Sequence, residues 1–449
     1  MNIESIHPTD WRLQRIARFS KAAKTKILFV VIDGLGGLPD PKYCAQGRFD
    51  STGVKSPKSE LEWASLQNKL ENLNHFVRDP KTVTGRVYPV GKGFTPGSIA
   101  GHLGIFGYDP DLYNSKRGPA EAAAIEGAID PGDIIARFNF CRVNQEGIVE
   151  DRRAGRVKEP GEGTRLVSKV AESLNIKDAV VRVIHTAGHR GLLVLRKTHK
   201  SDRPLSEHIS DTDPGIEGVP IEKCQPLNFG DAAAARTAAI INAFTKQVGD
   251  ILSDEPNANA IILRSFGTRP NLPHFGDVYN LDAIAIASYP AYRGIGSLVG
   301  MALLNGSSGC PGLRPGDPFG READFLEANY SNYDFFYVHY KLPDEKGEDG
   351  DFEGKVEALH CFDVHLPRLL KPEFDVVVIT GDHATPSLLA RHSHHSVPLA
   401  ISSRVMKGYD RSEEFTEPAC LRGARGFIDG PELMGIVLGN AGRLKKFDF

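Results

Sequence analysis

Four short apolar runs are separated along the chain by more polar segments. They are ILFVVI (27–32), AIAIA (283–287), FFYVHY (335–340) and VVVIT (376–380). Continuous β-branched and aromatic runs of this length are typical of strands that are buried on both faces of a parallel sheet. Helical patterns lie among them, for example at 61–77 and 354–370. Strands that alternate with helices predict an α/β fold in which helices sandwich a mostly parallel sheet.

The middle of the chain has a different pattern. The segment at 132–143 indicates a strand, and the segment at 179–196 indicates two strands joined by a turn at Gly188. A long helix is predicted over 231–248. We therefore expect a smaller α+β domain that is inserted into the first one. The expected ranges are 114–262 for the inserted domain, and 1–113 together with 263–449 for the other.

Composition narrows the class of protein. The 449 residues include 54 Lys+Arg and 57 Asp+Glu, and this near-neutral balance argues against nucleic-acid binding. No apolar run approaches the ~18 residues that cross a bilayer. Residues 1–24 lack the apolar core of a signal peptide and predict a weak amphipathic helix. The six cysteines are Cys44, Cys141, Cys224, Cys310, Cys361 and Cys420. They form no CxxC pair, so we expect free thiols in a reducing cytoplasm.

Acidic residues follow three of the four predicted strands. Asp33 comes directly after the first run, and Asp382 and His383 come just after the fourth. Asp344 and Glu348 lie a few residues beyond the third. Ligands of open α/β sheets bind beyond the carboxyl ends of the strands, so we expect these side chains to share one crevice. Crowded carboxylates need positive charge, and mixed Asp, Glu and His ligands suit Mn²⁺, Zn²⁺ or Mg²⁺.

Each of these signals has an ordinary alternative when it is taken alone. Asp33 before a glycine is typical of a turn, and Asp382 with His383 could cap a helix. The stretch DEKGEDGDFEG (344–354) has the composition of an exposed loop. His392 lies in the segment RHSHHSVP, which could be a solvated histidine cluster. Their conjunction at the ends of the strands favours the metal site.

A serine near residue 100 is a candidate nucleophile. The segment FTPGSIAGHL (94–103) indicates a glycine turn that enters a helix, with Ser98 in the first turn. Backbone N–H groups and the helix dipole favour a phosphate at this position. A serine hydroxyl is a weak nucleophile at its own pKa and needs a base or a metal ion. The alternative for Ser98 is a helix N-cap.

Taken in order, these and further motifs resemble those of a known family. The motifs are VVIDGLGG, TPGSIAGHLGIFGYDP, DRRAGRV, HRGLLVLR, SDTDPG, DEKGEDGDFEGK, TGDHATP, HSHHSVP and NAGRLKKF, and the resemblance extends from about Lys26 to Phe447. The chain resembles the cofactor-independent phosphoglycerate mutases, in particular their archaeal-type branch within the alkaline phosphatase superfamily. The resemblance implies an alkaline-phosphatase-like metal-binding domain and an inserted substrate-binding domain.

The resemblance also implies a reaction and a set of site residues. The reaction is the interconversion of 3-phosphoglycerate and 2-phosphoglycerate through a phosphoserine on Ser98, without 2,3-bisphosphoglycerate. The implied metal ligands are Asp33, Ser98, Asp382 and His383 for one ion, and Asp344, Glu348 and His392 for the other. The implied substrate-binding residues are Arg153, Arg156, His189 and Arg190.

Glu348 departs from the pattern of the archaeal branch, which has histidine at this position. A glutamate favours oxygen-loving ions, so we expect two divalent ions, Mn²⁺ or Mg²⁺ ahead of Zn²⁺. Loss of the second ion is the alternative.

Other functions remain open at this point. The chain could be a phosphohydrolase or a phosphomutase that acts on another phosphate ester, or a non-catalytic homologue. The expected partner is a small phosphoglycerate substrate, and we expect neither nucleic-acid nor membrane binding. The expected location of the protein is the cytoplasm. The sequence does not determine the oligomeric state.

Overall fold

The chain forms two compact units. The structure, a computed structural model, describes residues 5–49, 55–125, 127–199, 203–303, 320–406 and 410–447. The first unit comprises Met1–Asn114 and Asn271–Phe449, and the second comprises Ser115–Pro270. The boundary expected at residue 262 lies inside β9 (Ala260–Gly267). The second unit continues to Pro270 because β9 hydrogen-bonds along β5 (Ile134–Val143) of the same unit.

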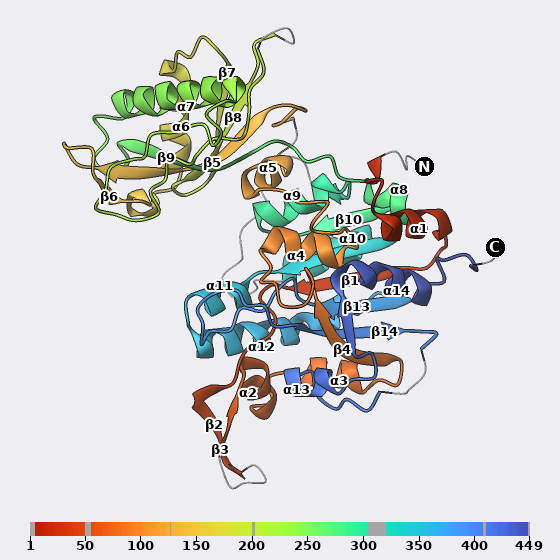
Figure 1. The fold of residues 1–449 in the computed structure, drawn as a ribbon. Helices are drawn as coiled ribbons and strands as arrows, with labels where there is room; N and C mark the ends of the chain where they lie inside the picture. Colours follow the sequence, from red (N-terminus) through yellow and green to blue (C-terminus); the bar gives the residue numbers. More distant parts are fainter. Residues whose placement is uncertain are drawn as a thin grey trace. The chain divides into compact units, whose positions relative to one another are not determined.

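The described residues of the first unit build an eight-stranded sheet in the order β11-β10-β12-β1-β13-β14-β4-β15 (Figure 1). Its strands are β1 (Ile27–Ile32), β4 (Thr82–Tyr88), β10 (Ala283–Ile286), β11 (Ala302–Leu303), β12 (Phe335–Tyr340), β13 (Val376–Thr380), β14 (Val397–Ser403) and β15 (Phe427–Asp429). The five strands from β11 to β13 run parallel, and β14 is antiparallel to both of its neighbours. The four apolar runs of the sequence are therefore confirmed as neighbouring parallel strands.

Helices cover both faces of this sheet (Figure 1). They are α1 (Trp11–Phe19), α2 (Glu60–Leu66), α3 (Glu71–Arg78), α4 (Ser98–Ile105), α8 (Phe275–Tyr279), α9 (Pro290–Leu298), α10 (Gly320–Asn329), α11 (Leu342–Glu348), α12 (Phe352–Leu369), α13 (Glu417–Leu421) and α14 (Leu433–Asn440), with the 3-10 turn η3 (Gly430–Glu432). Leu28 and Val30 of β1 pack in one core with Leu359 of α12. Phe29, between them, points to the opposite face, where its ring lies 5.8 Å from that of Phe106. The α/β sandwich predicted from the sequence is thus confirmed.

One helical pattern of the sequence is divided in two. The residues at 61–77 form α2 and α3 rather than a continuous helix. The break follows from Asn68, whose φ of 58° lies in the left-handed region that asparagine tolerates and that ends a helix. A short hairpin of β2 (Asp40–Phe49) and β3 (Lys55–Lys58) precedes α2.

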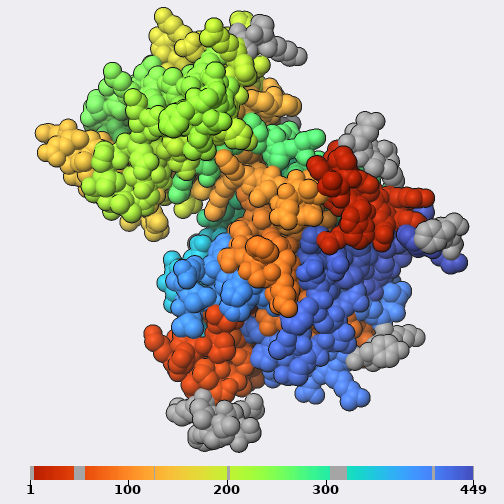
Figure 2. Space-filling view, viewed as in Figure 1, coloured from red at the N-terminus to blue at the C-terminus, as the bar shows by residue number. Residues whose placement is uncertain are grey.

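The predicted N-terminal amphipathic helix is α1, and it lies beside the end of the chain (Figures 1 and 2). The rings of Phe19 and Phe447 stack with centroids 4.7 Å apart, and the Lys445 N–H donates to the Phe19 carbonyl. Within the described residues no helix has both the length and the apolarity to cross a bilayer. None of the five described cysteines forms a disulfide, and Cys310 lies outside the described residues.

The second unit is built on an antiparallel sheet. Its described strands follow the order β6-β5-β8-β7, and β9 pairs with the other edge of β5. Its elements are α5 (Arg117–Ala123), β5, β6 (Val149–Asp151), η2 (Ala154–Arg156), α6 (Glu162–Ser173), β7 (Val180–Ala187), β8 (Arg190–Arg196), α7 (Ala232–Ile251) and β9. The hairpin predicted around Gly188 and the predicted long helix are both confirmed, as β7–β8 and α7.

A buried carboxyl group lies under the loop that follows β1. Glu417, the first residue of α13, accepts hydrogen bonds from the Gly37 N–H at 2.7 Å and from the Ser59 hydroxyl at 2.6 Å. Burial raises its pKa from an ordinary 4.5 to about 7, because the charged form loses its hydration.

This raised pKa predicts a pH-dependent stability. Between pH 4.5 and 7 the folded chain retains a proton on Glu417 that the unfolded chain releases. Its stabilising contribution is therefore complete below the unfolded pKa and is lost as the pH rises through about 7. Relative to Glu417→Gln, the wild type should lose about 2–3 kcal/mol of unfolding free energy between pH 5 and 8. Urea unfolding at both pH values measures this, with the exposed Glu414→Gln as control. Parallel pH profiles for the wild type and Glu417→Gln would contradict it.

Candidate metal centre

Three parallel strands end together and deliver polar residues to one place. Ile32 of β1 is in register with Tyr340 of β12, and Val31 of β1 with Thr380 of β13. Asp33 follows β1 directly, and the loop after β13 supplies Asp382 and His383. One ligand atom from each of these three buried residues lies within 4.8 Å of the other two. The structure thus brings together side chains that are about 350 positions apart in the sequence.

Ser98 joins this group as the first residue of α4. Its Oγ lies 3.3 Å from His383 Nε2. The residue that caps α4 is Gly97, so the alternative of Ser98 as an N-cap is wrong. The helix approaches the loop after β13 closely because residue 101 is glycine: a Cβ there would lie 2.1 Å from the Asp382 carbonyl oxygen.

The hydrogen bonds around His383 assign its ring proton. The Thr385 hydroxyl donates to Asp344 Oδ1 at 2.5 Å, so it accepts from His383 Nδ1 at 3.0 Å. Burial lowers the pKa of His383, which keeps the ring neutral with its lone pair on Nε2. That lone pair faces Asp382 Oδ2 at 3.2 Å and Asp33 Oδ1 at 3.3 Å. Such an arrangement is repulsive unless a cation lies between the three atoms.

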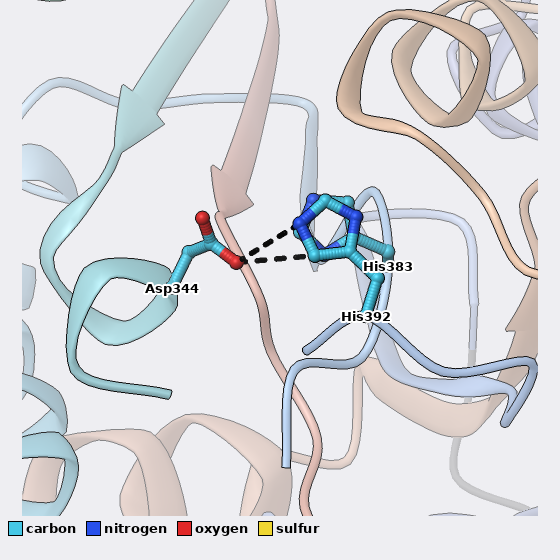
Figure 3. Close-up of side chains that lie close together, drawn as sticks. All are labelled: Asp344, His383 and His392. Carbon is cyan, nitrogen blue, oxygen red and sulfur yellow. Dashed lines mark ion pairs between the residues drawn. The ribbon is translucent and has the colours of Figure 1, made fainter. Parts of the chain in front are cut away.

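A second group adjoins the first (Figure 3). It consists of Asp344, His383 and His392, again with ligand atoms within 4.8 Å of one another. Asp344 lies in the first turn of α11 and is buried, so the exposed-loop alternative is wrong for this residue. His392 Nδ1 donates to the Pro96 carbonyl at 3.0 Å, which turns Nε2 toward Asp344 Oδ1 at 3.6 Å. The two histidine rings stack with centroids 3.6 Å apart.

Glu348 lies at the edge of this second group. Its Oε1 is 3.4 Å from His392 Nε2, and 54% of its side chain is exposed. Burial acts to lower the pKa of His392, but Glu348 and Asp344 outweigh it and raise this pKa to about 9. Glu348 belongs to neither compact group among the described residues. Its carboxylate nevertheless lies beside the ring nitrogen that faces Asp344.

Two residues at the end of β12 hold Asp33 in place, and the sequence interpretation did not assign them. His339 Nε2 lies 3.2 Å and Lys341 Nζ 3.0 Å from Asp33 Oδ2, and Lys341 also pairs with Asp344. Burial acts to raise the pKa of Asp33, but Lys341 and His339 outweigh it and hold this pKa well below its usual range. The signal in the sequence was a histidine within an apolar strand, two residues before a lysine on the same face.

His102 supports the centre from α4. It is fully buried one helical turn after Ser98, and its Nδ1 lies 2.7 Å from the Ser98 carbonyl and 3.1 Å from Asp382 Oδ2. Burial acts to lower the pKa of His102, but the Asp382 carboxylate outweighs it and raises this pKa. The spacing of four residues from Ser98 was the available signal, because it places both residues on one helix face.

The donors present fit divalent cations. Asp382 Oδ1 is buried and has no hydrogen-bond partner among the described residues, which is costly without an ion. Carboxylate oxygens and imidazole nitrogens are ligands for Mn²⁺, Mg²⁺ or Zn²⁺.

The four expected substrate-binding residues lie close together in the second unit. Arg153 precedes η2 and Arg156 ends it, His189 is in the turn between β7 and β8, and Arg190 begins β8. Burial, and then the charges of Arg190 and Arg153, lower the pKa of His189 to about 4. In the described part of the chain, none of these three arginines forms an ion pair.

The sheet of the second unit extends this basic cluster with residues that the sequence interpretation missed. Arg137 of β5 stands directly opposite Arg264 of β9, and strand alternation places Arg190 on the same face. Burial, and then neighbouring arginines, lower the pKa of Arg137 to about 10, and Glu121 is its partner at 3.1 Å. Arg264 also has a carboxylate partner, Asp213 at 3.6 Å, so Arg190 is the member of this face that forms no ion pair within the described residues. An arginine inside the apolar run at 132–143 was the signal.

Comparisons with known proteins show which family the chain resembles. A family model described as "2,3-bisphosphoglycerate-independent phosphoglycerate mutase" matches residues 80–258. A Thermus thermophilus protein named "probable 2,3-bisphosphoglycerate-independent phosphoglycerate mutase" is 38% identical over 433 residues, which cover 96% of this chain and 98% of that protein. An Aquifex aeolicus protein of the same name is 38% identical over 435 residues, 96% of this chain and 99% of its own.

A solved structure shares the fold. It is the cofactor-independent phosphoglycerate mutase from Thermoplasma acidophilum, with a TM-score of 0.60, 25% identity, and coverage of 93% of this chain and 100% of that one. The curated relatives match nearly the whole length of both chains at well over 30% identity. The chain therefore belongs to the family of 2,3-bisphosphoglycerate-independent phosphoglycerate mutases, which are isomerases.

Proposed function

We propose that the chain interconverts 3-phosphoglycerate and 2-phosphoglycerate through a phosphoserine on Ser98, with two divalent cations. The observation that carries this proposal is the position of the Ser98 hydroxyl beside His383 Nε2, whose lone pair also faces two buried carboxylates. Asp33, Asp382 and His383, with Ser98, would hold one ion. Asp344, His392 and Glu348 would hold the other.

In the proposed reaction, Ser98 carries the phosphoryl group, and neighbouring residues hold the metal ligands in place. Divalent cations in such a centre activate a hydroxyl and neutralise phosphate charge. The Ser98 hydroxyl gives up its proton as its Oγ bonds to the phosphorus and the ester bond to the glycerate breaks, and the released glycerate oxygen takes up a proton. The phosphoryl group then passes to the other hydroxyl of the glycerate, which gives up a proton, and the Ser98 hydroxyl is restored. His102 orients Asp382, and His339 and Lys341 orient Asp33.

In this proposal, residues of the second unit bind the negatively charged groups of the substrate. A phosphoglycerate carries a carboxylate and a phosphate, and guanidinium groups bind both in a bidentate manner. Arg153, Arg156 and Arg190 form no ion pair within the described residues, so their charges are available to such an anion. His189 is kept neutral beside them, since its pKa is lowered to about 4.

Replacement of the serine tests the proposed route. Ser98→Ala should abolish formation of 2-phosphoglycerate from 3-phosphoglycerate and the acid-stable phosphoprotein formed from ³²P-labelled substrate, because no hydroxyl remains to accept the phosphoryl group. Ser168→Ala, an exposed serine of α6, should keep both. Turnover near that of the wild type in Ser98→Ala would refute the phosphoserine. Release of inorganic phosphate by the wild type in place of 2-phosphoglycerate would identify a phosphohydrolase instead.

Replacement of Glu348 tests the metal preference. After removal of metal, the wild type should be reactivated by Mn²⁺ or Mg²⁺ more than by Zn²⁺, because a glutamate ligand favours hard ions. Glu348→His should raise the ratio of Zn²⁺ to Mn²⁺ bound in competitive loading by about tenfold, as elemental analysis measures. Glu353→His, at an exposed position of α12, is the matched control. An unchanged ratio in Glu348→His would exclude this residue as a ligand.

Replacement of an arginine tests the proposed substrate contacts. Arg190→Met should lower kcat/KM for 3-phosphoglycerate by roughly 10- to 100-fold, the loss expected for one charged hydrogen-bonding group. Arg182→Met, which removes an exposed arginine of β7, should lower it little. Steady-state kinetics of the three proteins make the comparison, and equal values for Arg190→Met and Arg182→Met would remove Arg190 from the site.

A further inference from the structure

A buried lysine joins the two loops that carry Asp33 and His383. Lys355, in the first turn of α12, is only 1% exposed. Its Nζ donates to the Gly36 carbonyl at 2.9 Å and to the Thr385 carbonyl at 2.7 Å. Gly36 lies three residues after Asp33, and Thr385 lies two residues after His383. One ammonium group therefore sets the distance between the loops after β1 and β13 at Gly36 and Thr385.

A glutamate compensates the charge of this lysine and binds the same loops. Glu60, the first residue of α2, has its Oε1 3.9 Å from Lys355 Nζ. The same oxygen accepts from the Ser387 N–H at 2.7 Å and from the Ser387 hydroxyl at 2.6 Å. Its other oxygen lies against Gly37, where a Cβ would be only 1.6 Å away. Both loops thus rest on a buried ion pair.

Burial of this ion pair costs free energy, and a well-packed core at this position does not need charged side chains. An ammonium group and a carboxylate that leave water lose hydration that their mutual attraction only partly restores, and apolar side chains of similar volume often stabilise such a position as well or better. Within the described residues, the hydrogen bonds and the ion pair of Lys355 go to two loop carbonyls and to Glu60, and none goes to a proposed metal ligand. Its contacts are those expected of a group that orients the loops bearing the ligands.

We propose that Lys355 is a positioning residue for the metal centre. By holding the Gly36 and Thr385 carbonyls, it keeps Asp33 and His383 at the separation that one cation needs. The inference rests on the metal centre proposed above. Outer groups that orient ligands typically contribute 10- to 100-fold to metal affinity, so loss of this lysine should weaken metal binding in a protein that is still folded.

Manganese binding measures this directly, without any assay of activity. The loss of the free Mn²⁺ signal in electron paramagnetic resonance gives the affinity and the number of ions bound by the full chain. We expect two ions on the wild type and a 10- to 100-fold weaker affinity in Lys355→Met. Lys26→Met is the matched control, because Lys26 Nζ also donates to a main-chain carbonyl, that of Tyr333, outside the two loops. It should bind Mn²⁺ as the wild type does.

A second variant separates positioning from folding. Lys355→Met leaves Glu60 buried without its cation, so the double variant Lys355→Met/Glu60→Gln removes both charges and preserves the fold more readily. Circular dichroism and urea unfolding establish that each protein is folded. Affinity equal to that of the wild type in either folded variant would overturn the inference. A wild type that binds no Mn²⁺ would overturn the metal centre itself, and this inference with it.

Discussion

The structure depends on the neutralisation of negative charge at the carboxyl ends of three parallel strands. Asp33, Asp382 and Asp344 are all buried there, and the lone pair of His383 Nε2 points at oxygens of the first two. Carboxylates this close are stable only with positive charge between or beside them. Lys341 supplies one such charge, to both Asp33 and Asp344. The unpartnered Asp382 oxygen shows that protein groups alone leave this requirement unmet among the described residues.

Close approach of backbones makes this concentration of ligands possible. Gly34, with a φ of +70°, lies where a Cβ would be 2.7 Å from the Asp344 Cα, so the loop after β1 and the start of α11 nearly touch. Gly101 lets α4 approach the Asp382 carbonyl in the same way. With these close approaches, side chains of the loop after β13 come within hydrogen-bonding distance of Ser98, Asp33 and Asp344. The buried pair of Lys355 and Glu60 holds two of these segments, the loops after β1 and β13, through hydrogen bonds to their main chains.

The second unit concentrates positive charge by a different device. Cross-strand register places Arg137, Arg190 and Arg264 on one face of its sheet. The neighbouring turn has non-glycine residues in the left-handed region, with φ of 48° at Ala154 and 68° at Arg156. The Asp151 carboxylate holds this turn through N–H groups at 2.6 and 2.7 Å. Left-handed backbone at residues other than glycine is strained, and it persists only where the surrounding structure holds it.

The local pattern of the sequence was sufficient for the strands, for the insertion of a second domain, and for the expectation that Asp33, Asp382 and His383 meet. Apolar runs determine which segments are buried, and parallel strands in one sheet end at the same edge. The sequence pattern could not show that His339, Lys341, His102 and Lys355 hold the ligands or their loops in place. Each of them does so through a contact with a residue that is distant in the chain. The pattern also could not separate Asp344, which is buried, from Glu348, which is half exposed, within one acidic stretch. Which face of α11 turns toward His392 is decided by tertiary packing, since burial depends on neighbours that composition does not specify.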